Sequence, residues 1–202
     1  TIKHILGLLR PMDGEIKVNG ITIRENNEKY RKSISYIPES PVLYDELTLE
    51  EHINLTAMAY GLNMKEAWEK ADVLLKLFKL SDKKKFFPVH FSKGMKQKVM
   101  IICSFLVEPN LYIIDEPFLG LDPIAINDLI NLMCEKRDNG ASILMSTHIL
   151  ATAEKYCDNF IIIHEGKILA SGKLSDLRKE FNMPDASLDE IYLALTTRGQ
   201  DE

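Results

Sequence analysis

Apolar residues recur at helical spacing in some parts of the chain and cluster as in strands in others. An apolar stripe through residues 2–9 predicts an opening helix that ends at Pro11 and Gly14. Residues 15–18 and 21–24 flank Asn19-Gly20 and predict two short strands joined by a tight turn. Residues 33–37 predict another strand, which ends at Pro38.

The pattern turns helical between residues 39 and 108, where no strand signal is visible. Thr48 and Glu51 form a capping-box pair and predict a helix start, with helical periodicity continuing to about residue 80. After Ser92 an apolar helix extends to residue 107 and ends before Pro109. We therefore expect a helical insert between two strand-containing parts.

Strands and helices alternate in the second half. Residues 111–114 are continuously apolar, which is typical of a strand buried on both faces. A helix (125–137), a strand (142–145), a helix (150–156) and a hairpin (159–164 with 167–170) are predicted to follow. This alternation indicates a parallel sheet in an α/β core. Two short helices, near residues 174–181 and 188–195, complete the prediction, and the acidic stretch from Asp185 is expected to be a solvated tail.

Composition narrows the class of protein. The 202 residues are 46% hydrophobic and 27% charged, which fits one globular domain, or two small ones, and excludes disordered, collagenous and coiled-coil chains. A net charge of -5 argues against a nucleic-acid-binding protein. The three cysteines form no Cys-x-x-Cys pair, so we expect buried free thiols rather than a zinc site or disulfides. The longest apolar stretch is too short to cross a bilayer, and no signal peptide is evident.

The adjacent carboxylates Asp115 and Glu116 follow the apolar strand at residues 111–114. Ligands of α/β sheets bind at the carboxyl ends of strands, so this position suits a functional pair. One carboxylate there can hold magnesium, usually through water, and its neighbour can orient a water for attack on a phosphoryl group. A surface-exposed acidic pair after an ordinary strand is the alternative interpretation.

Four further motifs accompany this pair in a fixed order. They are Tyr36-Ile37-Pro38-Glu39, Phe91-Ser92-Lys93-Gly94-Met95-Lys96-Gln97-Lys98, Leu121-Asp122-Pro123 and Ser146-Thr147-His148. Together with Asp115-Glu116 the ordered set resembles the ATP-binding subunits of ABC transporters. The resemblance covers the whole chain.

The resemblance implies a role for each matching residue. Asp115 corresponds to the Walker B aspartate and Glu116 to the catalytic base. Glu39 lies at the Q-loop position, where a carboxylate in place of the usual glutamine can still reach magnesium. Asp122 lies in the loop that crosses to a partner subunit, and His148 matches the switch histidine at the γ-phosphate.

Ser92, Lys93, Gly94 and Met95 match the family signature, whose common form is Leu-Ser-Gly-Gly-Gln. The physical basis of such a site is a helix N-terminus that receives an anion. Gly94 permits close backbone approach, while Lys93 adds a positive charge and Met95 removes a side-chain amide. Taken alone, Ser92 would be interpreted as an ordinary helix cap, because serine is common at that position.

The phosphate-binding loop Gly-x-x-x-x-Gly-Lys-Ser/Thr does not occur in these 202 residues. The resemblance places that loop just before the opening helix, so Thr1 is expected at or just after its end. The chain as written is therefore expected to be N-terminally truncated and to hydrolyse little or no ATP by itself. Micromolar ATP binding by this chain in titration calorimetry would contradict that expectation.

The resemblance implies a P-loop NTPase-like α/β fold with a mainly parallel sheet. Residues 1–38 and 104–180 are expected to form an incomplete ATPase core, 39–103 a helical subdomain, and 181–202 a C-terminal helix and acidic tail. ATP and Mg²⁺ are the implied ligands. The implied partners are a transmembrane permease subunit, which docks beside Glu39, and a second copy in a homodimer. No nucleic-acid partner is implied.

The family resemblance also implies a peripheral protein at the cytoplasmic face of the cell membrane. Residues 37–44 are similar to those of Ecs-type exporter ATPases. Two alternatives belong to other classes: a non-transport ABC ATPase, which would carry a long coiled-coil insertion or a second nucleotide domain, and a non-enzymatic regulatory docking module.

Overall fold

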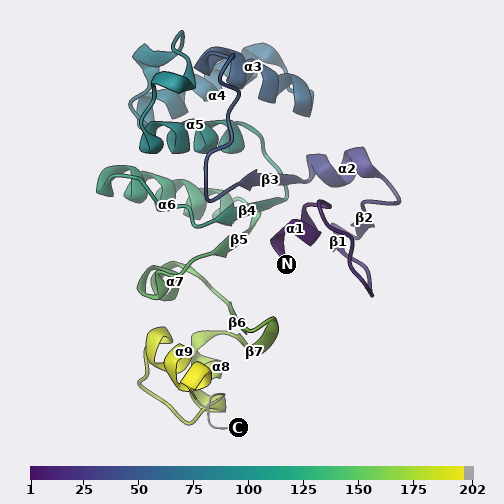
Figure 1. Ribbon diagram of the computed structural model, residues 1–202, viewed down its shortest axis with the longest axis vertical. Coiled ribbons are helices and arrows are strands. Elements are labelled where there is room, and N and C mark those ends of the chain that lie inside the picture. Colours follow the sequence, from purple (N-terminus) through teal and green to yellow (C-terminus); the bar gives the residue numbers. More distant parts are fainter. Residues whose placement is uncertain (198–202) are drawn as a thin grey trace. The chain divides into compact units, whose positions relative to one another are not determined.

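The computed structural model describes residues 1–197 and divides the chain into two compact units (Figure 1). The first comprises Thr1–Ser146, and the second begins at Thr147. Each unit has its own cluster of buried hydrophobic residues.

The first unit is built on a three-stranded parallel sheet in the order β3 (Ile34–Ile37), β4 (Leu111–Asp115), β5 (Ser142–Ser146). The three central residues of β4 are buried, as its continuous apolar pattern predicts. Asp115 and Ser146 pair at the end of β4 and β5, so the carboxyl ends of these strands share one edge. The predicted α/β class with a parallel sheet is confirmed.

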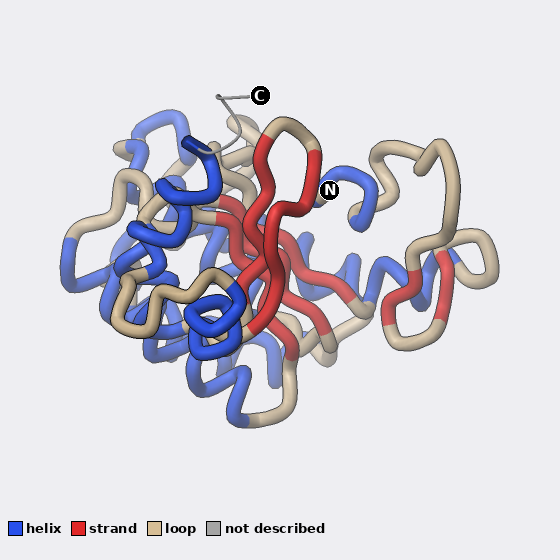
Figure 2. The backbone as a smooth tube through the Cα atoms, turned by 90° about the horizontal axis from the view of Figure 1, so that it is seen from below, coloured by secondary structure: helices blue, strands red, loops and turns tan. Residues whose placement is uncertain are grey.

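A separate antiparallel ribbon consists of β1 (Lys17–Val18) and β2 (Ile21–Thr22), joined at the predicted Asn19-Gly20 turn. Both turn residues have positive φ, which asparagine and glycine tolerate better than other residues. Figure 2 shows this ribbon apart from the three-stranded sheet.

The opening helix α1 is shorter than predicted and covers only Ile2–Ile5. Gly7 ends it with a φ of +70°, and a Cβ at this glycine would clash with the Ile23 side chain. A helix that the sequence pattern did not predict, α2, spans Asn27–Lys32. Its Tyr30 is buried and donates a hydrogen bond of 2.7 Å to the carbonyl of Ile5, which fastens α2 to α1.

Three helices gather at one end of the first unit: α3 (Leu49–Tyr60), α4 (Met64–Leu77) and α5 (Lys93–Leu106) (Figure 1). Residues 39–108, all of which the structure describes, contain no strand, as expected. Two short 3-10 turns, Ser81–Lys83 and Pro88–His90, connect α4 to α5. The capping box predicted at the start of α3 is present.

Helix α6 (Pro123–Asp138) follows β4 and packs against β5. It begins two residues earlier than predicted because Asp122 serves as its N-cap and Pro123 occupies the first helical position. The loop between β4 and α6 therefore starts at a carboxylate pair and ends at a third carboxylate.

The second unit contains α7 (Leu150–Tyr156), β6 (Phe160–His164), β7 (Lys167–Gly172), α8 (Leu174–Glu180) and α9 (Leu188–Thr197). This order of elements is the predicted one. Strands β6 and β7 form an antiparallel hairpin whose Phe160, Ile162 and Ala170 are buried.

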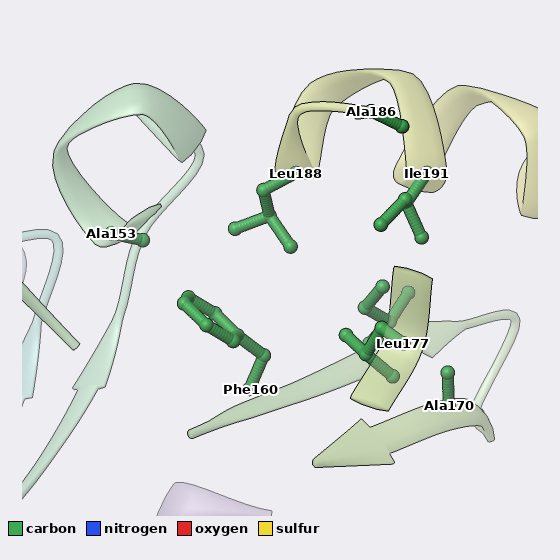
Figure 3. Packing of buried hydrophobic residues seen from close by; sticks show 8 residues of the cluster. Ala153, Phe160, Ala170, Leu177, Ala186, Leu188 and Ile191 are labelled. Carbon is green, nitrogen blue, oxygen red and sulfur yellow. The ribbon is translucent and has the colours of Figure 1, made fainter. Parts of the chain in front are cut away.

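Helix α9 corrects the expectation of a solvated tail from Asp185 onward. Its Leu188 and Ile191 are buried and pack with Leu177 and Phe160, as Figure 3 shows. The apolar residues of this helix recur at helical spacing between the acidic ones, so its apolar face packs into the core. Residues 198–202 of the expected tail lie outside the described residues.

Among the described residues the three cysteines form no disulfide, and each is half-buried rather than fully buried as expected. Desolvation raises the pKa of the Cys103 thiol to about 11, which keeps it protonated and unreactive. Within residues 1–197, none of the helices combines the length and apolar character needed to cross a membrane.

Candidate functional site

Asp115 and Glu116 lie at the carboxyl end of the middle strand, where the sequence predicted them. The Ser146 hydroxyl donates a hydrogen bond to the Asp115 carboxylate from the neighbouring strand β5. The Glu116 amide donates to the Ser146 carbonyl at 3.0 Å, which continues the sheet pairing one residue beyond β4. Both carboxylates are half-buried. The pair is therefore anchored to the sheet rather than carried on a free surface loop.

Glu116 has a φ of +46°, which is uncommon for a residue with a side chain. Here the chain leaves β4 and turns towards α6. Such conformations cost free energy and are concentrated at functional sites. The turn gives Glu116 a backbone conformation different from that of Asp115, although the two are adjacent in sequence.

Glu39 and Asp115 act on the same tyrosine hydroxyl, that of Tyr36 on β3. Burial raises the pKa of Tyr36, and the negative charge of Asp115, a hydrogen bond to it and the charge of Glu39 raise it further. Glu39 is exposed, two residues beyond the end of β3. The two residues expected to bind metal thus follow or end adjacent strands at the same edge of the sheet.

The residues expected to form the signature surround the N-terminus of α5. Ser92 is the N-cap, and its hydroxyl oxygen accepts a hydrogen bond of 3.3 Å from the Met95 amide. Ser92 and Lys93 are exposed, while Gly94 and Met95 are half-buried. The capping interpretation of Ser92 is thus confirmed, and capping leaves the anion-binding interpretation open.

Gly94 packs against the loop between β4 and α6. A Cβ on Gly94 would clash with the carbonyl oxygen of Gly120, a glycine that itself has a φ of +79°. Only glycine at position 94 allows the helix backbone and this loop to approach so closely.

Asp122 is bonded on both carboxylate oxygens. One accepts a hydrogen bond of 2.9 Å from the Ala125 amide at the start of α6, and the other pairs with Lys98 of α5 at 2.7 Å. The hydrogen bond from Lys98 and that from Ala125 lower the pKa of Asp122 to about 2. The salt bridge joins helix α5 to the loop that follows the carboxylate pair.

Two of the expected site residues, Thr1 and His148, are exposed. Thr1 is exposed and caps α1 through its backbone carbonyl only, without a side-chain hydrogen bond. His148 is exposed and belongs to the second unit, two residues beyond the end of β5. The Thr147 hydroxyl beside it accepts a hydrogen bond of 3.1 Å from the Ile149 amide.

Four residues at this site received no role from the sequence: Tyr36, Ser146, Gln97 and Lys98. Gln97 is fully buried on α5 and donates a hydrogen bond of 3.4 Å to the carbonyl of Pro38, the residue before Glu39. Tyr36 and Ser146 were visible within the motifs, but only the strand register brings them to Asp115. Lys98 could have been found as the basic residue one turn beyond the signature.

The donors at the sheet edge are oxygen atoms. Carboxylates, hydroxyls and phosphates suit magnesium, which binds few protein carboxylates and keeps several waters. Within residues 1–197, no three His, Cys, Asp or Glu side chains gather closely enough to hold a metal ion alone. The donor set therefore fits a magnesium ion shared with a phosphate ligand, and does not fit a self-sufficient metal centre.

Comparisons with known proteins agree with this geometry. The sequence model of the family described as "ABC transporter" matches residues 1–119. EcsA of Bacillus subtilis (strain 168), an ABC-type transporter ATP-binding protein, is 61% identical over 97% of this chain and 79% of its own length. YthP of the same organism, described as an uncharacterized ABC transporter ATP-binding protein, is 42% identical over 95% of this chain and 77% of its length.

Solved structures show the same fold. One described as the ATP-binding subunit of an ABC transporter superposes with a TM-score of 0.94 and 57% identity, covering 96% of this chain and 81% of its own. The cbiO1 protein of Clostridium perfringens, part of the transporter complex cbiONQ, gives a TM-score of 0.70 at 26% identity, covering 89% of this chain and 74% of its own. The P-loop NTPase-like fold is thereby confirmed.

Proposed function

The chain belongs to the ABC transporter family of ATP-binding subunits, which are ATPases, and from that premise we propose how its residues serve ATP hydrolysis. The observation that carries the proposal is the carboxylate pair Asp115 and Glu116, anchored to β5 through Ser146. The test is magnesium-dependent ATP hydrolysis by the full-length subunit, measured with and without its membrane partner.

We propose that Asp115 and Glu39 hold a magnesium ion together with the phosphates of ATP. Asp115 ends β4 and Glu39 follows the neighbouring strand β3 by two residues, which supports their sharing one ion. When bound, magnesium neutralises charge on the phosphoryl group that is transferred. Because Glu39 adds a negative charge where the family has a glutamine, a Glu39→Gln variant should require a higher magnesium concentration.

Glu116 is proposed as the general base that orients water and accepts its proton. A positioned base contributes roughly 10²- to 10⁴-fold to a rate, so Glu116→Gln should lower ATP turnover by about 100-fold or more and leave ATP binding intact. The matched control is Glu165→Gln, because Glu165 also has positive φ but lies in the β6–β7 turn. Undiminished turnover in Glu116→Gln would remove this residue from the base role.

We further propose that two copies form a homodimer in which each signature faces the nucleotide of the other copy. Ser92, Lys93, Gly94 and Met95 would contact the γ-phosphate side of that nucleotide through the N-terminus of α5. Asp122 would cross to the partner, and His148 would contact the γ-phosphate held by its own copy. ATP-dependent dimerisation of Glu116→Gln in size-exclusion chromatography, abolished by a further Ser92→Arg substitution, is the expected result.

The membrane partner is proposed to dock on the segment after Glu39, within the proposed helical subdomain 39–103, which ends inside α5. Val42 and Tyr44 expose 74% and 61% of their surface there. The Tyr44 amide donates a hydrogen bond of 3.0 Å to His52 Nε2, which ties this segment to α3. Such docking would hold the subunit at the cytoplasmic face of the membrane. The rest of the subunit would then be the proposed ATPase core, residues 1–38 and 104–180, and the proposed C-terminal helix and acidic tail, residues 181–202.

This docking surface can be tested by charge insertion. Val42→Asp should abolish co-purification with the membrane subunit, because it places a charge in an apolar contact. Val73→Asp on α4 is the matched control, since Val73 exposes a similar fraction of its surface, 69%. Equal co-purification of both variants would exclude the segment around Val42 as the docking surface.

A further inference from the structure

Asp115 occupies the middle strand, so a neighbouring strand flanks it on each side. The register places Ser146 of β5 directly opposite Asp115. On the other side Tyr36 of β3 lies opposite Ile113, two residues before Asp115. Side chains two apart on a strand share a face, so Tyr36 and Ser146 both reach the face that carries the Asp115 side chain.

The Ser146 Oγ donates a hydrogen bond to Asp115 Oδ1. Tyr36 lies on the same face of the sheet, and burial together with the negative charge of Asp115 raises the pKa of its hydroxyl. Ser146 and Tyr36 are half-buried, which shields this bond in part from competing water. Asp115 is thus bonded to the Ser146 hydroxyl on one side and has the hydroxyl-bearing Tyr36 of the other flanking strand on the same face.

A carboxylate held in this way has a defined plane. The χ2 torsion of aspartate is a broad sp³–sp² rotation, so the plane is otherwise poorly fixed. A carboxylate accepts about four hydrogen bonds or ligands, and the Ser146 hydroxyl leaves the remaining lone pairs for water or metal. Magnesium demands nearly ideal octahedral geometry, whereas calcium accepts variable geometry and longer bonds. Fixing the plane should therefore matter more for magnesium than for calcium.

We propose that Tyr36 and Ser146 are positioning residues for the divalent cation, fixing the Asp115 carboxylate in the orientation that a small octahedral ion requires. The proposal rests on the proposed role of Asp115 in holding magnesium. Neither residue contacts the reacting atoms. Their effect is on the affinity for the metal and on the choice between metals.

The experiment measures metal binding in the full-length subunit. Mn²⁺, a spectroscopic substitute for Mg²⁺, is titrated by electron paramagnetic resonance in the presence of a non-hydrolysable ATP analogue. The variants are Tyr36→Phe, Ser146→Ala and Ser146→Thr, the last of which keeps the hydroxyl. Tyr60→Phe is a matched control because the Tyr60 hydroxyl donates to the Ile34 carbonyl on β3, and Ser142→Ala controls for the other end of β5.

Tyr36→Phe and Ser146→Ala should each weaken Mn²⁺ binding about tenfold, the lower end of the loss seen when outer-shell partners of metal ligands are removed. Ca²⁺ binding, measured by competition against Mn²⁺, should weaken less. Ser146→Thr and both controls should bind like wild type. Affinity for the nucleotide without metal should be unchanged in all variants.

Unchanged Mn²⁺ affinity in both Tyr36→Phe and Ser146→Ala would overturn the inference, as would equal losses for Mn²⁺ and Ca²⁺. If Ser146→Ala does not fold, Tyr36→Phe decides the question, because it removes one oxygen atom and keeps the ring packed. Failure of the proposed function gives a different result: wild type would then bind no Mn²⁺ with the nucleotide, or Asp115→Asn would leave that binding intact.

Discussion

The contact between Gly94 and Gly120 leads to a prediction whose sign depends on two opposing effects. Replacing Gly94 by alanine favours the helix by up to about 1 kcal/mol, because alanine loses less backbone entropy than glycine. Against this, the new Cβ would overlap the Gly120 carbonyl oxygen, which is backbone and cannot rotate away. Overpacking of this kind costs about 1–3 kcal/mol.

Relief of the overlap requires movement of the loop between β4 and α6. That loop is held at its end by the Lys98–Asp122 salt bridge and by the cap of α6. We therefore expect Gly94→Ala to lower the free energy of unfolding by about 1–2 kcal/mol, since the steric cost exceeds the helix propensity gain.

Urea unfolding of the full-length subunit, followed by circular dichroism, measures this difference as a lower midpoint at unchanged slope. Lys96→Ala, in the same turn of α5, is the control and should change stability by less than about 0.5 kcal/mol. A Gly94→Ala variant as stable as wild type, or more stable, would refute the steric reasoning, because helix propensity would then dominate.

Three further predictions concern the cap of α6, the cap of α5 and the core of the second unit. Because its folded pKa lies below the usual value, ionised Asp122 stabilises the protein above about pH 4 and loses this effect towards pH 2. Asp122→Ala should thus lower the free energy of unfolding by about 1–2 kcal/mol at pH 7, mainly through loss of the helix cap, because the half-exposed salt bridge adds little. In urea unfolding, the difference in stability between this variant and wild type should narrow between pH 4 and 2. Ser92→Ala should cost about 1 kcal/mol in the same assay, and Ser92→Asn should restore it; equal stability of all three would contradict the capping role. Ile191→Ala should cost about 2–4 kcal/mol and lower the melting temperature, whereas the exposed Leu193→Ala on the same helix should not.

Local sequence signals predicted the elements whose ends are set by local chemistry. The capping box at Thr48, the cap at Ser92 and the hairpin turn at Glu165-Gly166 are present where expected. In each case a side chain or a turn conformation satisfies backbone groups within a few residues, so the signal is contained in the sequence itself.

Elements that depend on tertiary contacts were missed or misjudged. Helix α2 lacks an apolar stripe and is held mainly by Tyr30, whose hydroxyl reaches the carbonyl of Ile5. That contact could not be derived from periodicity, because its partners are distant in sequence. Helix α1 ends early at Gly7, whose φ of +70° terminates the helix locally although the apolar stripe continues to residue 9.

The residues of the candidate site likewise divide into those that local sequence predicted and those that depend on tertiary contacts. Asp115 and Glu116 were placed correctly at the end of the middle strand, because a continuous apolar run predicts a buried strand and its exit. Tyr36 and Ser146 could not be assigned to Asp115, since that requires the register of three strands separated by long insertions. The roles of the individual site residues stay predictions that the variants above can test.

Helix α5 is also attached to β3 at Ser104, far from the residues expected to form the signature. Ser104 donates a hydrogen bond of 3.1 Å to the Tyr36 carbonyl, and its own carbonyl accepts one of 3.0 Å from Ser35. Ser92 lies twelve residues away, about 18 Å along the axis at 1.5 Å per residue. A rotation of about 5° around the Ser104 attachment would displace Ser92 by about 1.6 Å, given that lever arm. At this length, a small angular change of α5 beside β3 corresponds to an ångström-scale displacement at Ser92, which the Lys98–Asp122 salt bridge and the Gly94–Gly120 contact would oppose.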